Sequence, residues 1–149
     1  PIGAVIASKA VGDAMTPGTH GSTFGGNPLA MAAAQAVLET ITEDGFMAGI
    51  QLSMAYLDTA LLQLHNAFPA VITELRGRGF LRGIRLGDGV DLMAVVSQLR
   101  ADHILVVPAA ENTLRLLPPL IITADEIDYL MRGLTTAFEM IDVPKAGGK

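Results

Sequence analysis

His20-Gly21-Ser22-Thr23-Phe24-Gly25-Gly26-Asn27-Pro28 places two hydroxyl side chains among three glycines, directly before a predicted helix. Glycine has no side chain, so it lets a backbone approach a ligand closely and it tolerates a positive φ. Asn27 is a good N-cap residue, and Pro28 suits the first position of a helix. Such a loop can offer backbone N–H groups and hydroxyls to an anion. These residues therefore predict either a phosphate or carboxylate site or an ordinary turn.

The composition indicates a chain that buries part of its surface against something else. Of the 149 residues only 17% are charged and 50% are hydrophobic, whereas an ordinary soluble domain has about 25% charged residues. We expect the cover to come from a partner subunit or from further parts of a longer polypeptide. The chain opens at Pro1 without a methionine, and we interpret this as a start after processing or inside a longer protein.

Charge and residue counts argue against several classes of protein. A net charge of -5 provides no basic patch, so we expect no nucleic-acid partner. The absence of cysteine argues against a disulfide scaffold and thiolate chemistry. We find no long apolar run and no secretory signal, so we expect no membrane association and a cytoplasmic location. No metal is expected, because the three histidines have no metal-ligand spacing: His20, His65 and His103.

The periodicity predicts an α/β chain in three parts, residues 1–42, 43–69 and 70–149. The first part has a short buried strand over 3–8 and an alanine-rich helix from Pro28 to about Ile41. A helix from Phe46 to about Asn66 dominates the second part. The expected elements of the third part are strands over 71–76 and 80–86, a helix around 92–99, strands over 104–107 and 113–117, and a helix opened by a capping box at Thr123–Glu126. This β-β-α-β-β-α order favours helices packed over a small sheet.

Arg115 is the charged residue most informative about function. It lies in an apolar strand that ends at two prolines, and strand alternation turns it away from Leu114 and Leu116. Its planar guanidinium can bind a carboxylate through two hydrogen bonds. That carboxylate belongs either to a ligand or to another side chain of the protein in an ordinary salt bridge. Four other arginines cluster around glycines in an expected exposed hairpin, and the sequence singles out none of them: Arg76, Arg78, Arg82 and Arg85.

Two other chemistries fit these residues less well. Ser22 lacks the glycine two positions earlier that a hydrolase nucleophile elbow needs, because His20 stands there. The loop also lacks the Gly-Lys-Ser/Thr of a phosphate-binding P-loop. An N-terminal proline amine, here Pro1, can act as a base or nucleophile in a tautomerase-like enzyme, but the rest of the chain offers no support for that chemistry.

Three parts of the sequence, in this order, resemble the class III (fold type I) aminotransferases, which use pyridoxal phosphate. They are Pro1–Ala4 together with Gly18–Ala30, then Leu75–Gly83, then Leu114–Leu120. The resemblance extends from residue 1 to about residue 141. Within the class, Thr19–Pro28 is most similar to the acetylornithine branch, and the ornithine branch is close behind.

This resemblance implies a fold, a reaction and a set of roles. Residues 1–42 would be the end of the large cofactor-binding domain, 43–69 the connecting helix, and 70–149 the small C-terminal α/β domain of a homodimeric enzyme. The parent enzyme would transfer the amino group of N-acetylornithine, or of ornithine, to 2-oxoglutarate, a step of arginine biosynthesis. Thr23 would bind the phosphate of the cofactor held mainly by the neighbouring subunit. Ser22 would contact phosphate or substrate, and Arg115 would bind the substrate α-carboxylate.

The resemblance also implies that no catalytic residue lies within this chain. The Schiff-base lysine of the family precedes the segment that begins here with Pro1, as does the aspartate that pairs with the pyridine nitrogen. The lysines present match no family motif: Lys9, Lys145 and Lys149. We therefore expect the chain alone to be inactive. A non-catalytic module that dimerises or binds a partner, and a fragment with no function of its own, remain alternatives.

Overall fold

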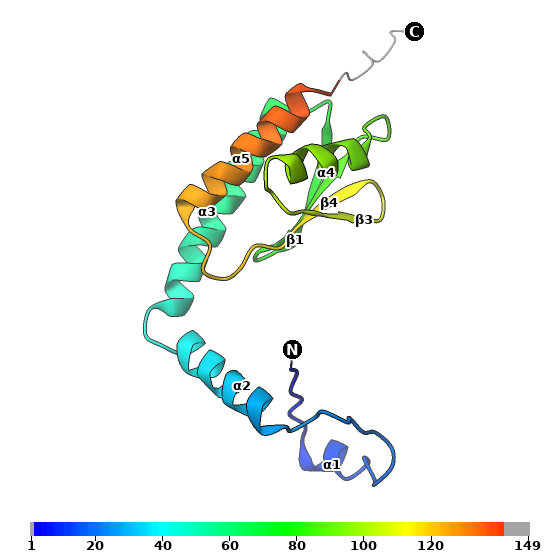
Figure 1. Cartoon of the computed structure of the whole chain (residues 1–149), viewed down its shortest axis with the longest axis vertical. Helices are drawn as coiled ribbons and strands as arrows, with labels where there is room; N and C mark the ends of the chain where they lie inside the picture. The colour runs from blue at the N-terminus through cyan, green and yellow to red at the C-terminus, as the bar shows by residue number, and fades with distance from the viewer. Residues whose placement is uncertain (1, 142–149) are drawn as a thin grey trace. The chain divides into compact units, whose positions relative to one another are not determined.

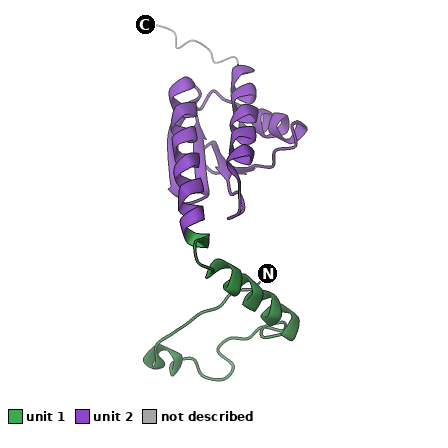
Figure 2. Cartoon of the chain, turned by 90° about the vertical axis from the view of Figure 1, so that its left-hand side faces the viewer, with its two compact units in different colours: residues 1–47 green, residues 48–149 purple. Residues whose placement is uncertain are grey.

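The computed structural model describes residues 2–141, in which helices and strands follow one another in the order α1, α2, α3, β1, β2, α4, β3, β4, α5 (Figure 1). The chain divides into unit 1, Pro1–Met47, and unit 2, Ala48–Lys149 (Figure 2). The boundary falls inside the first turn of α3. The three-part division into 1–42, 43–69 and 70–149 stays a prediction.

Unit 1 contains the helices α1, Lys9–Gly12, and α2, Pro28–Ile41. Asn27 is the N-cap of α2, and its side-chain oxygen accepts a hydrogen bond of 2.9 Å from the N–H of Ala30. Pro28 begins the helix, where its missing N–H costs nothing. The sequence-based expectation for the start and the extent of this helix is confirmed.

The strand expected over residues 3–8 is wrong. Residues 2–8 have no regular secondary structure, and Val5 and Ile6 are 93% and 100% exposed. A strand needs a neighbour to satisfy its backbone groups, and no strand of unit 1 within the described residues supplies one. The apolar character of this segment therefore reflects something other than burial inside its own unit.

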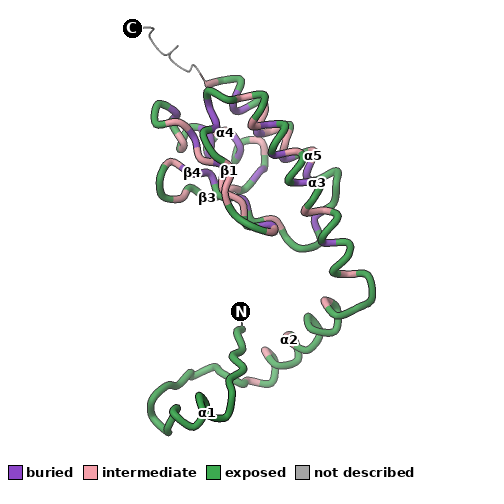
Figure 3. Tube along the Cα trace, turned by 180° about the vertical axis from the view of Figure 1, so that it is seen from behind, coloured by how far each residue is buried: buried purple, intermediate pink, exposed green. Residues whose placement is uncertain are grey.

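Unit 1 has no core of its own among the residues described. Within residues 2–47 no residue is buried, as Figure 3 shows by the mostly green trace of this unit. Helix α2 exposes large apolar side chains, of which Leu29 is 83% exposed and Val37 and Leu38 are each 58% exposed. Isolated helices of this length are marginal in water, so α2 needs apolar contacts beyond those that unit 1 provides.

Unit 2 is an antiparallel sheet with helices, as the β-β-α-β-β-α expectation requires. Its helices are α3, Phe46–Ala67, α4, Leu92–Ala101, and α5, Ala124–Glu139. Its strands are β1, Ile72–Arg78, β2, Leu81–Leu86, β3, Val107–Ala109, and β4, Thr113–Leu116. They lie in the order β1-β2-β4-β3, so β2 and β4 are the two central strands.

The core of unit 2 is built from one face of this sheet and the apolar stripes of the helices. Alternate strand residues are buried, among them Ile84 on β2 and Leu114 on β4, which are paired in register and 0% exposed. The helices contribute residues at steps of three and four, and those at most 2% exposed are Leu57, Leu61, Val95, Val96, Leu99, Ile127, Leu134 and Phe138. The opposite face of the sheet carries other polar positions of the strands, among them Arg76 and Arg115.

The third strand begins later than the expected 104–107. Residues 104–106 have no strand structure, and Ile104 takes part in the end of α4 instead, since its N–H donates to the carbonyl of Leu99 at 2.8 Å. His103 before it has a φ of 59°, a left-handed conformation that is common where a helix ends. An apolar pattern does not show where a helix ends, and for this reason the sequence predicted the start of the strand too early.

A capping box at the start of α5 generates a test of the fold. The hydroxyl of Thr123 accepts a hydrogen bond from the N–H of Glu126, while Glu126 accepts one from the N–H of Thr123 at 2.8 Å. The Glu126 carboxylate accepts hydrogen bonds from the N–H and the hydroxyl of Thr123, and these two bonds hold its pKa below the ordinary value. We expect Thr123→Ala to lower the free energy of unfolding of unit 2 by about 1 kcal/mol, measured by urea denaturation. Thr135→Ala, a control at a half-buried position inside α5, should lack this capping loss because alanine favours the helix interior; equal losses in both variants would contradict the capping assignment.

Candidate functional site

The loop between α1 and α2 presents the hydroxyls of Ser22 and Thr23. Both residues are exposed, and neither side chain has a hydrogen-bond partner within residues 2–141. Gly25 closes over Ser22: a Cβ at position 25 would lie 3.0 Å from Ser22 Cβ and 3.2 Å from Ser22 Oγ. Gly26 has a φ of 70°, which favours glycine. The loop is therefore folded tightly around a hydroxyl that is free to meet a ligand.

Asn27 fastens this loop to the helix that follows it. Its side-chain nitrogen donates to the carbonyl of Phe24 at 2.7 Å, while its side-chain oxygen caps α2 through Ala30. One side chain thus fixes both the end of the loop and the beginning of the helix. An anion bound at the loop would meet hydroxyls and N–H groups beside a helix N-terminus, an environment that stabilises negative charge.

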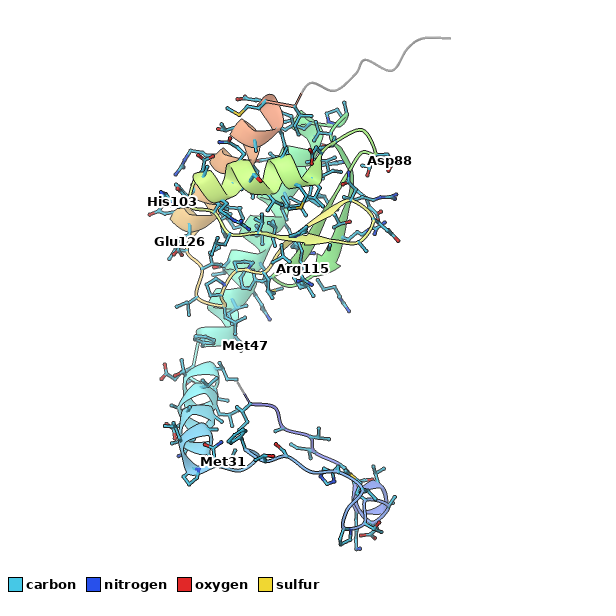
Figure 4. The ribbon with its side chains drawn as sticks, turned by 45° about the vertical axis from the view of Figure 1, so that its right-hand side comes forward. Met31, Met47, Asp88, His103, Arg115 and Glu126 are labelled. Atoms are coloured by element: carbon cyan, nitrogen blue, oxygen red, sulfur yellow. The ribbon has the colours of Figure 1, made fainter. Side chains whose placement is uncertain are left out.

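Arg115 lies on the open face of the sheet in unit 2 (Figure 4). Its neighbours Leu114 and Leu116 are 0% and 3% exposed, whereas Arg115 is exposed, as strand alternation predicts. Arg115 is paired in register with Gly83 of β2, and Gly83 is paired with Arg76 of β1. Residues opposite one another across strands share a face, so two arginines stand on either side of a residue without a side chain.

The partners of these two arginines differ. Arg76 forms ion pairs with Glu74 at 2.8 Å and with Glu111 at 2.6 Å. The hydrogen bonds to Glu111 and Glu74 raise the pKa of Arg76, and the guanidinium in turn lowers the pKa of Glu111. Arg115 forms no ion pair with any residue in the described part of the chain. The alternative of an ordinary intra-chain salt bridge thus holds for Arg76, while the donors of Arg115 remain available.

Arg82 has a structural role that the sequence did not single out. It points to the core face of β2, pairs with Asp58 of α3 and donates to the carbonyl of Gly77 at 2.8 Å. Its side chain is only 16% exposed. Arg82 therefore links α3 to the β1–β2 hairpin, and we assign it a role in packing rather than in ligand binding. The relevant signal was the strand period, which places Arg82 and Ile84 on one face and Gly83 on the other.

The structure brings Ser22 and Thr23 together in one loop of unit 1, while Arg115 belongs to unit 2. A pocket of about 330 Å³ in unit 2 contains neither group of residues; His103 and Glu126 line it together with the apolar segment after β4 (Figure 4). Within residues 2–141 no cluster of three or more His, Asp or Glu side chains could hold a metal ion. In that same range we find no helix with the length and apolarity needed to cross a membrane.

Comparison with known proteins identifies the family of the chain. The family model for class III aminotransferases matches residues 1–138. The chain is 41% identical over 143 residues to an acetylornithine aminotransferase of Brucella melitensis, a match that covers 96% of this chain and 35% of that protein. The chain therefore belongs to the class III aminotransferases. It spans about a third of the length of the curated relatives it matches.

Solved structures of the same fold match as well. A lysine aminotransferase from M. tuberculosis superposes with a TM-score of 0.74 at 33% identity, over 81% of this chain and 28% of that one. An ornithine aminotransferase from Toxoplasma gondii, with PLP partly occupying its active site, gives a TM-score of 0.71 at 35% identity, over 86% of this chain and 31% of that one. The fold is accordingly that of fold type I aminotransferases.

Pyridoxal phosphate is the cofactor of this family, and the loop in unit 1 fits its phosphate. The fit rests on two features: free hydroxyls on Ser22 and Thr23, and the close approach of Gly25 to Ser22, which a side chain at position 25 would crowd. The loop lies directly before the N-terminus of α2, where N–H groups favour a phosphate. Among the lysines, Lys9 is exposed and bound to Asp13 at 2.7 Å; Lys145 and Lys149 lie outside the described residues.

The two hydrogen bonds of the Asn27 side chain generate a test of the loop. We expect Asn27→Ala to destabilise the start of α2 by about 1 kcal/mol, because both bonds are lost. The carbon chemical shifts of residues 28–31 in an NMR spectrum should move toward random-coil values. Asn27→Asp keeps the capping oxygen and should preserve these shifts while changing those of Phe24. Unchanged shifts in the alanine variant would show that the cap does not organise the loop.

Proposed function

We propose that this chain is the C-terminal part of a pyridoxal-phosphate aminotransferase that uses N-acetylornithine as amino donor and 2-oxoglutarate as acceptor. Support for the donor comes from the curated relatives, several of which are acetylornithine aminotransferases 40–44% identical to the chain. The alternative donor is ornithine or a similar diamino acid, which the names of the solved relatives favour. The step belongs to arginine biosynthesis in the proposed assignment.

The proposed roles divide between the two units. Ser22 and Thr23 bind the cofactor phosphate, and Ser22 also contacts substrate. When bound, the cofactor supplies an electron-withdrawing ring for the carbon that carries the amino group. The residues of this chain hold and orient: hydrogen bonds to the phosphate fix one end of the site, and a fixed substrate carboxylate sets the direction of the bond that reacts.

Arg115 is the residue proposed to bind the substrate α-carboxylate. The main support for this proposal is that Arg115 forms no ion pair within the described residues. It is an exposed arginine on a central strand, anchored by buried neighbours. Arg76, on the same row of the sheet, is already bound to two carboxylates. A planar guanidinium with free donors on a rigid strand is suited to a carboxylate held by two hydrogen bonds.

We place the active enzyme in a homodimer. The supporting observation is the surface of unit 1, where no residue of 2–47 is buried and α2 exposes leucine, methionine and valine side chains. A patch of this kind marks a surface that another polypeptide segment covers. In the proposed dimer Thr23 reaches the cofactor held mainly by the other subunit. The cytoplasmic location stays a prediction.

The 149-residue chain alone is proposed to be inactive. The chain corresponds to about a third of its curated relatives, and Lys9, the one lysine in the described range, is engaged by Asp13. The alternative of a non-catalytic module that dimerises or binds a partner predicts a cellular product of this length. The intact mass of the gene product separates the alternatives, because the aminotransferase proposal requires a product about three times as long.

Replacing Arg115 tests the carboxylate assignment. In the full-length enzyme, Arg115→Gln should lower kcat/KM for N-acetylornithine by about 10- to 100-fold, since a hydrogen bond to a charged group is lost. The same change should leave kcat/KM for N-acetyl-1,4-diaminobutane, which lacks only the carboxylate, nearly unaltered. The ratio of the two kcat/KM values, from steady-state kinetics, reports carboxylate recognition directly.

Arg100→Gln is the matched control, because Arg100 is exposed at the end of α4. It should keep the wild-type ratio for the two donors. Equal losses on both donors in the Arg115→Gln enzyme would mean that Arg115 supports the fold rather than the carboxylate, and the proposed role would then be wrong.

A further inference from the structure

The strand that carries Arg115 faces a glycine of the neighbouring strand β2. Gly83 is paired with Arg115 in the antiparallel β2–β4 ladder. A Cβ at position 83 would lie 2.9 Å from the Cγ2 methyl of Thr113 and 3.7 Å from Cβ of Arg76. The first distance is shorter than two carbon atoms tolerate, since their optimal separation is about 3.5–4.0 Å. The Thr113 methyl therefore occupies the space that a side chain at position 83 would need.

Thr113 cannot easily turn this methyl elsewhere. The residue is polar and yet buried, with only 7% of its surface exposed. Its hydroxyl donates to the carbonyl of Glu111 at 3.2 Å, which fixes one branch of the side chain and directs the other toward Gly83. Threonine has few χ1 rotamers available, and rotation would break this hydrogen bond.

The strand has little freedom to relieve such a collision by moving as a whole. β4 lies between β2 and β3, so backbone ladders hold it on both sides. Leu114 and Leu116 fix it from the core face, with exposed fractions of 0% and 3%. Thr113 and Arg115 are two positions apart on the same face. A shift forced on Thr113 is therefore transmitted to the base of the Arg115 side chain.

We propose that Gly83 and Thr113 are positioning residues for the carboxylate site at Arg115: the missing side chain of one and the methyl of the other fit together and set where the guanidinium stands. This inference rests on the proposed role of Arg115. It adds two residues that touch neither substrate nor cofactor, and it explains why a central strand next to the site contains glycine, which otherwise weakens a strand.

The test adds a methyl group at position 83 and then removes the Thr113 methyl group that it would meet. In the full-length enzyme, Gly83→Ala should raise KM for N-acetylornithine about tenfold with a smaller change in kcat, because displacement of a positioning group weakens orientation. KM for N-acetyl-1,4-diaminobutane should stay the same. Adding Thr113→Ser removes the Cγ2 methyl and keeps the hydroxyl, so the double variant should recover the wild-type ratio of kcat/KM for the two donors.

A second glycine provides the control. A Cβ at position 89 would meet no other atom within 4 Å, so Gly89→Ala should keep the wild-type ratio. If Gly83→Ala does not fold, the double variant still decides: wild-type discrimination in it supports the fit, and lost discrimination overturns it.

The outcomes separate this inference from the function on which it rests. Loss of discrimination in Arg115→Gln but not in Gly83→Ala would overturn the positioning role and leave the function intact. Loss in Gly83→Ala that Thr113→Ser does not repair would also overturn it. Unchanged discrimination in Arg115→Gln would refute the carboxylate assignment itself, and the positioning role would fall with it.

Discussion

The antiparallel pairing of β2 with β4 is the constraint on which unit 2 depends. Its register places Ile84 opposite Leu114 on the core face and Gly83 opposite Arg115 on the open face. A slip of one residue would exchange the two faces, burying a guanidinium and exposing leucines. The same pairing therefore serves both the core and the candidate site, so that the stability of the sheet and the placement of Arg115 cannot be separated.

The two units differ in how far they bury their own apolar side chains. Unit 2 closes a core of its own, built from α3, α4, α5 and one sheet face, and Arg82 joins that core through Asp58. Unit 1 consists of short helices and a glycine loop with no buried residue in 2–47. The low charge content of the whole chain, 17%, comes partly from this apolar, exposed unit. The proposed phosphate site in this loop therefore requires other polypeptide segments to complete it.

Much of the fold follows from local sequence signals. The N-cap at Asn27, the capping box at Thr123 and the alternation around Arg115 were all predictable, because each depends on residues close together in the chain. The strand expected over 3–8 fails because strand formation needs a neighbour, and the strand expected over 104–107 begins late because Ile104 completes the end of α4. For the site, the sequence supplied Ser22, Thr23 and Arg115 through family motifs. It could not distinguish Arg76 from Arg82, nor relate Gly83 to Thr113, since those relations exist only in the register of the folded sheet.

The most direct measurement is a crystal structure of the full-length protein with pyridoxal phosphate and a bound carboxylate substrate or inhibitor. We expect the ligand carboxylate to lie about 2.7–2.9 Å from the guanidinium nitrogens of Arg115, and the Thr23 hydroxyl to bind the phosphate of the cofactor in the other subunit. A structure in which Arg115 instead pairs with a protein carboxylate, while the ligand carboxylate binds elsewhere, would contradict it.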